Sequence, residues 1–226
     1  MSGMNRAAAE SVSEYGGYIL YLRSFDDDEF QFDSVPFAWR RIVQNIINPF
    51  SAYFGLWFPP PCFEDIIVGA LWRFRPVLCV TAPSDAFHIS IQHVPLIRTI
   101  ALRIPLSPET WRGQVLQLAD RADQIIMVVG GTVGVRWEFQ SLVSSAALRR
   151  KLVLLAPPED NEGVRSRWSA FLEGNIESCP AGWTENAPRT IGVRLGANPA
   201  LDTVFTADER SISAYQLAIR LAQTSL

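Results

Sequence analysis

The sequence has too few cysteines for a disulfide framework. Only three occur in 226 residues, and Cys62, Cys79 and Cys179 lie far apart in apolar sequence with no CxxC pair. An odd number of isolated cysteines favours buried, reduced thiols in a reducing compartment. The chain is therefore not expected to be a secreted protein held together by disulfides.

The sequence also lacks a segment that could enter a membrane. Residues 1–14 are small and polar, without the apolar core of a signal peptide, and no uncharged apolar run reaches the roughly 18 residues that span a bilayer. We expect residues 1–17 to form a flexible N-terminus. We also expect a cytoplasmic protein with no transmembrane segment.

Several kinds of binding site are missing as well. The net charge is −3 and no run of Lys or Arg is present, so we expect no nucleic acid partner. His88 and His93 have no cluster of Cys or acidic residues at ligand spacing, which argues against a metal site. No GxSxG occurs, so neither histidine has a nucleophile elbow to serve.

The sequence does contain short apolar runs that alternate with segments of helical periodicity. Four runs predict strands buried on both faces: 18–22, 76–80, 124–129 and 151–155. Weaker signals predict a short strand at 99–102 and edge strands at 190–195 and 203–206. Helices are predicted at 63–74, 107–122, 164–172 and 211–222, and after Thr132. Strand alternating with helix indicates an α/β fold with a doubly wound, mainly parallel sheet, and 48% hydrophobic residues suffice to cover both faces.

Local signals refine three of these helices. Glu64 and Asp65 fall in the first turn of one helix, where the helix dipole favours anions. Ser107, followed by Pro108 and Glu109, predicts the start of another, with the serine as its cap. The helix after Thr132 carries one apolar stripe, made of Val135, Phe139, Leu142, Val143 and Ala146.

An aromatic-rich insertion at about 30–61 separates the first strand from its helix. It is too long for an ordinary connection and ends in a run of prolines. Its large rings are Phe32, Phe37, Trp39, Phe50, Tyr53, Phe54, Trp57 and Phe58. One interpretation is a helical hairpin that packs these rings onto the domain. The alternatives are an active-site lid, a dimer contact or a surface that touches a membrane.

Ligands of open parallel sheets bind beyond the carboxyl ends of the strands, so the loops there are the candidate sites. The first strand leads into Arg23, Ser24, Phe25 and Asp26, which offer a cation, a hydroxyl, an aromatic ring and a carboxylate. Such a set can hold a phosphate and stack on a base. The alternative is a solvated acidic loop in which Arg23 pairs with an aspartate.

The third of the buried strands leads into a second candidate site. Gly130, Gly131 and Thr132 form a predicted turn, which is only a weak phosphate-loop signal. Glu138 follows Val135 by three residues, so it borders the apolar stripe of its helix and is expected to face the crevice. The alternative is a surface glutamate beside a buried Trp137.

The order and spacing of these segments resemble Toll/interleukin-1 receptor (TIR) domains of bacterial proteins. The similarity covers about residues 18–158 in the segments YILYLRSFDDD, FEDIIVGAL, QIIMVVGGTVGVRWEF and RRKLVLLAPPE, and the segment from Thr203 resembles the usual end of these domains. The resemblance implies a flavodoxin-like sheet and one TIR-like domain over 18–226. It also implies a catalytic Glu138 and a substrate site made of Arg23, Ser24, Phe25, Asp26, Thr132 and Trp137.

The resemblance further implies that the chain cleaves the nicotinamide–ribose bond of NAD+, which is then a substrate and not a cofactor. The implied setting is bacterial antiphage defence or nucleotide signalling, with a homo-oligomer or a partner protein. One alternative is a TIR-like interaction module without turnover. A weaker similarity, to nucleoside 2-deoxyribosyltransferases, implies a different enzyme of N-glycosidic bonds with a glutamate nucleophile.

Overall fold

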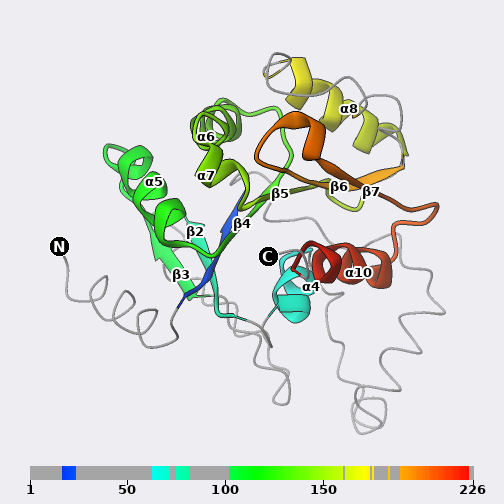
Figure 1. Cartoon of the computed structure of the whole chain (residues 1–226), viewed down its shortest axis with the longest axis horizontal. Coiled ribbons are helices and arrows are strands. Elements are labelled where there is room, and N and C mark those ends of the chain that lie inside the picture. The colour runs from blue at the N-terminus through cyan, green and yellow to red at the C-terminus, as the bar shows by residue number, and fades with distance from the viewer. Residues whose placement is uncertain are drawn as a thin grey trace, which may run out of the picture.

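The fold was analysed in a computed structural model (Figure 1), which describes residues 17–23, 63–71, 75–81, 102–159, 161–173, 175, 183 and 189–223. The aromatic-rich insertion therefore lies outside the described residues. So do Ser24, Phe25, Asp26 and both histidines.

The described residues form a seven-stranded mixed sheet. Its strands are β1 (Ile19–Leu22), β2 (Val77–Thr81), β3 (Leu102–Pro105), β4 (Gln124–Val128), β5 (Leu152–Leu155), β6 (Thr190–Arg194) and β7 (Thr203–Thr206). Across the sheet they follow the order β3-β2-β1-β4-β5-β6-β7. The first five in that order are mutually parallel, whereas β6 runs antiparallel to β5 and β7 antiparallel to β6. The predicted α/β class with a mainly parallel sheet is confirmed.

Helices cover both faces of this sheet. They are α4 (Phe63–Leu71), α5 (Trp111–Arg121), α6 (Val133–Val143), α7 (Ala146–Arg149), α8 (Asn161–Glu173) and α10 (Ile212–Gln223), with a short 3-10 helix η4 (Pro199–Leu201). Figure 1 shows α4 and α10 together on one side and α5, α6, α7 and α8 on the other. Among the described helices, none is long and apolar enough to cross a membrane.

The side chains of β1 explain why both faces must be covered. All four residues of this strand are buried. Leu20 and Leu22 enter the core beneath α5, α6 and α8, whereas Ile19 and Tyr21 enter the core beneath α4 and α10. Because alternate side chains point to opposite faces, an uninterrupted apolar strand requires a helical layer on each side.

Two predicted boundaries are wrong in position. The helix expected from Ser107 begins at Trp111, because the Ser107 carbonyl accepts hydrogen bonds from the amides of both Thr110 and Trp111 and closes a separate turn. The Ser107 hydroxyl meets Glu109 inside that turn and caps no helix. The weak strand signal at 99–102 corresponds to β3, which is displaced to Leu102–Pro105.

Two other expectations fail for reasons of topology and local structure. Residues 190–195 and 203–206 were both predicted as edge strands, but only β7 lies at an edge, because β6 lies between β5 and β7. The predicted apolar stripe of the helix after Thr132 does not extend to Ala146. That helix ends at Val143, the Ser144 hydroxyl donates to the Ser141 carbonyl at 2.7 Å, and Ala146 begins α7 with its side chain exposed.

A buried ion pair fastens the turn between β6 and β7 to α7. Arg149 donates from its two terminal nitrogens to the two carboxylate oxygens of Asp202, at 2.8 and 2.9 Å. The Arg149 guanidinium also donates to the Gly196 carbonyl at 2.6 Å, and the Gly196 amide donates to Asp202 at 2.9 Å. Both charged side chains are at most 6% exposed. Such a bidentate pair fixes geometry as well as adding energy.

We predict that Asp202→Ala lowers the free energy of unfolding by about 3–5 kcal/mol, because it leaves the Arg149 charge buried without its carboxylate counter-ion. Asp208→Ala is the matched control. Asp208 pairs with Arg189 on the surface, and such pairs contribute only about 0–1 kcal/mol. Urea denaturation of the two variants measures both effects, and equal losses would show that the buried pair has no special structural role.

Candidate functional site

The topological switch point of this sheet, where a ligand crevice is expected, lies at the carboxyl ends of β1 and β4. These strands are neighbours, yet α4, after β1, packs on one face of the sheet and α6, after β4, packs on the other. A crevice opens where two such connections diverge. Arg23 directly follows β1, and the turn before Thr132 directly follows β4. The structure thus places the starts of both predicted loops at the same edge of the sheet.

Thr132 caps α6 at this edge. Its hydroxyl accepts a hydrogen bond from the Val135 amide at 3.4 Å, which satisfies one free amide of the first turn. The preceding glycine has a packing role: a Cβ on Gly131 would lie 3.0 Å from the Cβ of Ala170 in α8. Close packing between the turn and α8 accounts for Gly131 without any phosphate.

Glu138 is buried in α6. The residue is 8% exposed and lies on the same helix side as Val135, Phe139 and Leu142, so the surface interpretation is wrong. Burial raises the pKa of Glu138 to about 8, since an apolar environment disfavours the charged form. Among the described residues, no group hydrogen-bonds to its Oε2 atom. A buried polar atom left in this state costs about 1–3 kcal/mol and marks a candidate functional group.

Trp137 belongs to a surface cluster between α5 and α6. Its ring meets that of Trp111 edge to face, with centroids 4.9 Å apart. The Arg112 guanidinium lies 5.3 Å from the Trp137 centroid and 5.6 Å from the Trp111 centroid. Trp137 is the sequence neighbour of the buried Glu138, so α6 presents Glu138 to the core and Trp137, with an exposed cation and a second half-buried indole ring, to α5.

Arg23 points to the opposite side of the sheet from Glu138. Its guanidinium lies over the Tyr21 ring and 3.1 Å from the Glu64 carboxylate of α4, and the two charged side chains are 5% and 10% exposed. The Cys79 thiol donates to the same carboxylate at 3.7 Å. Arg23 is therefore paired with a helix residue in the layer of α4 and α10, whereas Glu138 lies in the layer of α5 to α8.

Three residues at this end of the sheet are not predicted as site residues by the sequence patterns: Glu64, Trp111 and Arg112. Glu64 was expected only to favour the helix dipole, and its pairing with Arg23 could not be inferred from residues 41 positions apart. Trp111 and Arg112 lie in the interior of the predicted helix, whereas the observed helix begins at Trp111, four residues later than predicted. The signal that could have found them is an aromatic residue and a cation in the first turn of a helix that starts beside the crevice.

Comparison of the chain with family models, with curated proteins and with solved structures gives no match.

We predict that Arg23→Ala lowers the free energy of unfolding by about 3–5 kcal/mol, because the Glu64 carboxylate stays buried without its cation. The double variant Arg23→Met, Glu64→Met removes both charges and should recover most of that loss. Arg75→Ala is the control, since Arg75 forms an exposed pair with Asp123 that contributes about 0–1 kcal/mol. If Arg23→Ala proves as stable as Arg75→Ala, Arg23 does not stabilise the fold through its pair with Glu64.

We also predict that Glu138→Gln stabilises the fold as pH rises. In the wild type, the pKa of Glu138 lies near 8 in the folded chain and near 4.5 in the unfolded chain, so the folded state holds one more proton between these values. The free energy of unfolding of the wild type is therefore highest below about pH 4.5, with respect to this group. It falls as the pH rises toward 8, by at most about 1.4 kcal/mol per pH unit.

The measurement is the difference in unfolding free energy between Glu138→Gln and the wild type at pH 5, 6.5 and 8, which should grow with pH. Glu173→Gln, at an exposed position of α8, is the control and should follow the wild type. A difference that is constant over this range would mean that Glu138 is ionised in the folded protein throughout.

Proposed function

We propose that the protein cleaves the nicotinamide–ribose bond of NAD+ with Glu138 as the catalytic carboxylate. The observation that carries this proposal is the buried carboxyl of Glu138, whose Oε2 has no hydrogen-bond partner among the described residues and which stands in the second turn of α6, the helix that follows β4 at the switch point of the sheet. A carboxyl in this position needs a partner that bears positive charge or a hydroxyl. The substrate supplies both.

The chemistry follows from the electrostatics of Glu138. Bond cleavage gives ribose C1′ oxocarbenium character while nicotinamide departs as a neutral group with the bonding electron pair. A carboxylate in a water-poor site stabilises that positive charge strongly, because no solvent screens the interaction. Burial holds the pKa of Glu138 near 8 in the free protein, and the cationic nicotinamide ring of a bound substrate shifts it downward into the ionised form.

Neighbouring residues would hold the substrate around this carboxylate. Trp137 and Trp111 offer ring faces for stacking, and Arg112, held over both rings, offers a cation for the diphosphate. Thr132 contributes the amino-terminal end of α6. Arg23, with the Ser24, Phe25 and Asp26 that follow it, stays in the proposed site, but a diphosphate at Arg23 would have to share the guanidinium with Glu64.

The strand order supports the finer proposal of a flavodoxin-like, TIR-like sheet. Strands β2, β1, β4, β5 and β6 lie in the order 2-1-3-4-5 when they are numbered without β3, which is the flavodoxin order. β3 is then an addition beyond β2, and β6 departs from the pattern by its antiparallel direction. We further propose, from the resemblance to bacterial TIR domains, a cytoplasmic homo-oligomer that acts in antiphage defence or nucleotide signalling.

The decisive experiment is incubation of the full chain with NAD+ and chromatographic measurement of free nicotinamide. We predict that Glu138→Gln lowers kcat by at least about a hundredfold, in the range expected when a charge that stabilises the transition state is removed, and that it also raises KM, because the ionised carboxylate attracts the cationic ring of the bound substrate. Glu173→Gln should behave as the wild type. Release of a free base from deoxyribonucleosides but not from NAD+ would assign the chain to the deoxyribosyltransferase alternative, and binding of NAD+ without any turnover would favour the interaction module.

The pH profile gives a second prediction. Because the carboxylate is the active form, kcat/KM should rise with pH and level off above about 8, the value to which burial raises the pKa of Glu138 in the free protein. Residual activity of Glu138→Gln should lack this rise. A wild-type profile that falls from pH 6 to 8 would show that protonated Glu138 is the active form and would overturn the assignment of a catalytic carboxylate.

A further inference from the structure

A groove lies at the edge of the sheet opposite to Glu138. Its volume is about 480 Å³, which falls within the roughly 300–1,000 Å³ of small-molecule sites. Its walls come from the residues before β4 and β5 and from the turn between β6 and β7. These segments meet because β6 runs antiparallel to β5, so that its carboxyl end reaches the amino ends of the parallel strands.

Three cations line this groove although the chain as a whole is acidic. Arg150 and Lys151 precede β5, and Arg194 ends β6. The acid among the described lining residues is Asp123, which already pairs with Arg75 at 3.2 Å. Lys151 donates to the Asp120 carbonyl at 2.7 Å, a contact that positions the ammonium without neutralising it. The described lining residues therefore carry a formal net positive charge, which suits an anion with more than one negative charge.

The groove is held in shape by buried contacts. The Arg149–Asp202 pair ties the end of α7, next to Arg150, to the turn that follows Arg194. The Gly196 position in that turn admits no side chain, because a Cβ would lie 2.7 Å from the Leu201 carbonyl oxygen. The backbone that carries Arg150 and Arg194 is therefore fixed beside the groove. A backbone that is already in place loses little further entropy when an anion binds, whereas the exposed Arg150 side chain still has to be ordered.

An apolar surface adjoins the three cations. Leu201 lines the groove with its side chain 61% exposed, and Ala147 and Ala197 lie on the same surface with their side chains exposed. An exposed leucine beside three cations fits a ligand that joins a phosphate to a flat apolar group. A nucleotide has both parts, with the phosphate for the arginines and the base for Leu201.

We propose that this groove is a nucleotide-binding site, separate from the site of Glu138 and independent of the proposed NAD+ cleavage. Calorimetric titrations of ATP, AMP, adenosine and inorganic phosphate into the full chain test it. ATP should bind saturably and more tightly than AMP, and adenosine should bind at least tenfold more weakly than AMP. The affinity for ATP should fall with rising salt, because phosphate contacts with cations are screened.

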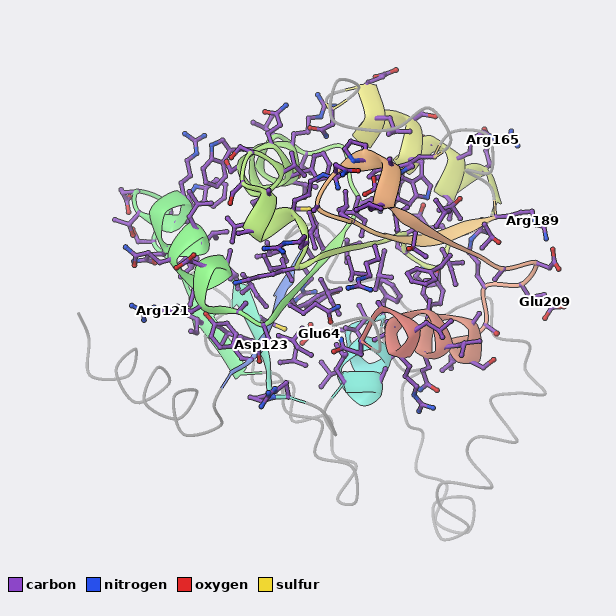
Figure 2. The ribbon with its side chains drawn as sticks, in the orientation of Figure 1. Glu64, Arg121, Asp123, Arg165, Arg189 and Glu209 are labelled. Atoms are coloured by element: carbon purple, nitrogen blue, oxygen red, sulfur yellow. The ribbon has the colours of Figure 1, made fainter. Side chains whose placement is uncertain are left out.

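The variants are chosen to locate the binding. Arg150→Gln should weaken ATP binding at least fivefold, and the double variant Arg150→Gln, Arg194→Gln at least tenfold. Leu201→Ser should weaken AMP binding and leave phosphate binding unchanged. The matched control is Arg165→Gln, on the surface of α8, which Figure 2 shows across the molecule from Asp123.

The outcomes separate the two sites. Binding of ATP that survives in Glu138→Gln but is lost in the groove variants supports the proposal, whether or not the chain cleaves NAD+. Loss of binding in Glu138→Gln alone would place the nucleotide in the crevice instead. Absence of saturable ATP binding, equal binding by the groove variants and the wild type, or phosphate that binds as tightly as AMP would each overturn the nucleotide assignment.

Discussion

Burial of a parallel sheet on both faces is the constraint on which the rest of this structure depends. The strands β1, β4 and β5 are apolar on both sides, so each connection must return as a helix across one face or the other. The connection after β1 uses one face and the connection after β4 uses the other. Their divergence between neighbouring strands makes this the switch point of the sheet, and the position of Glu138 follows from the helix that β4 must lead into.

Three buried carboxylates of the described chain have different electrostatic environments. Asp202 accepts two hydrogen bonds from the Arg149 guanidinium and one from a backbone amide. Glu64 forms an ion pair with Arg23 and accepts a hydrogen bond from the Cys79 thiol. Burial raises the pKa of Glu138, and no described group hydrogen-bonds to its Oε2 atom. Two carboxylates thus hold elements together at the cost of desolvation, whereas the third lowers the stability of the ligand-free fold. A fold retains such a destabilising residue most readily when the residue stabilises a bound ligand or a transition state.

Apolar periodicity was enough to predict the α/β class and the buried strands, because these depend on local runs such as residues 18–22. It failed at two places: a local turn at Ser107 delays the start of α5, and pairing across the sheet makes β6 an interior strand because β7 adds beyond it. For the site, the spacing of Glu138 against Val135 predicted its burial side. The partner of Arg23 could not be predicted, because Glu64 follows the insertion in the sequence. Only the packing of α4 on the sheet beside β1 brings the Glu64 carboxylate within 3.1 Å of the Arg23 guanidinium.

The α6–α7 segment connects the two edges of the sheet. Glu138 stands near its beginning, at the carboxyl edge of β4, and Arg149 and Arg150 stand at its end, at the amino edge of β5. The break at Ser144 divides the segment into two short helices, and the second is held at its end by Asp202. A ligand between Arg150 and Arg194 would therefore act on the end of α7 that this pair fixes, one short helix away from α6, which carries Glu138. Two proposed sites on one continuous segment have a physical route for coupling. The strength of that coupling depends on whether a shift of α7 also shifts α6 across the break at Ser144.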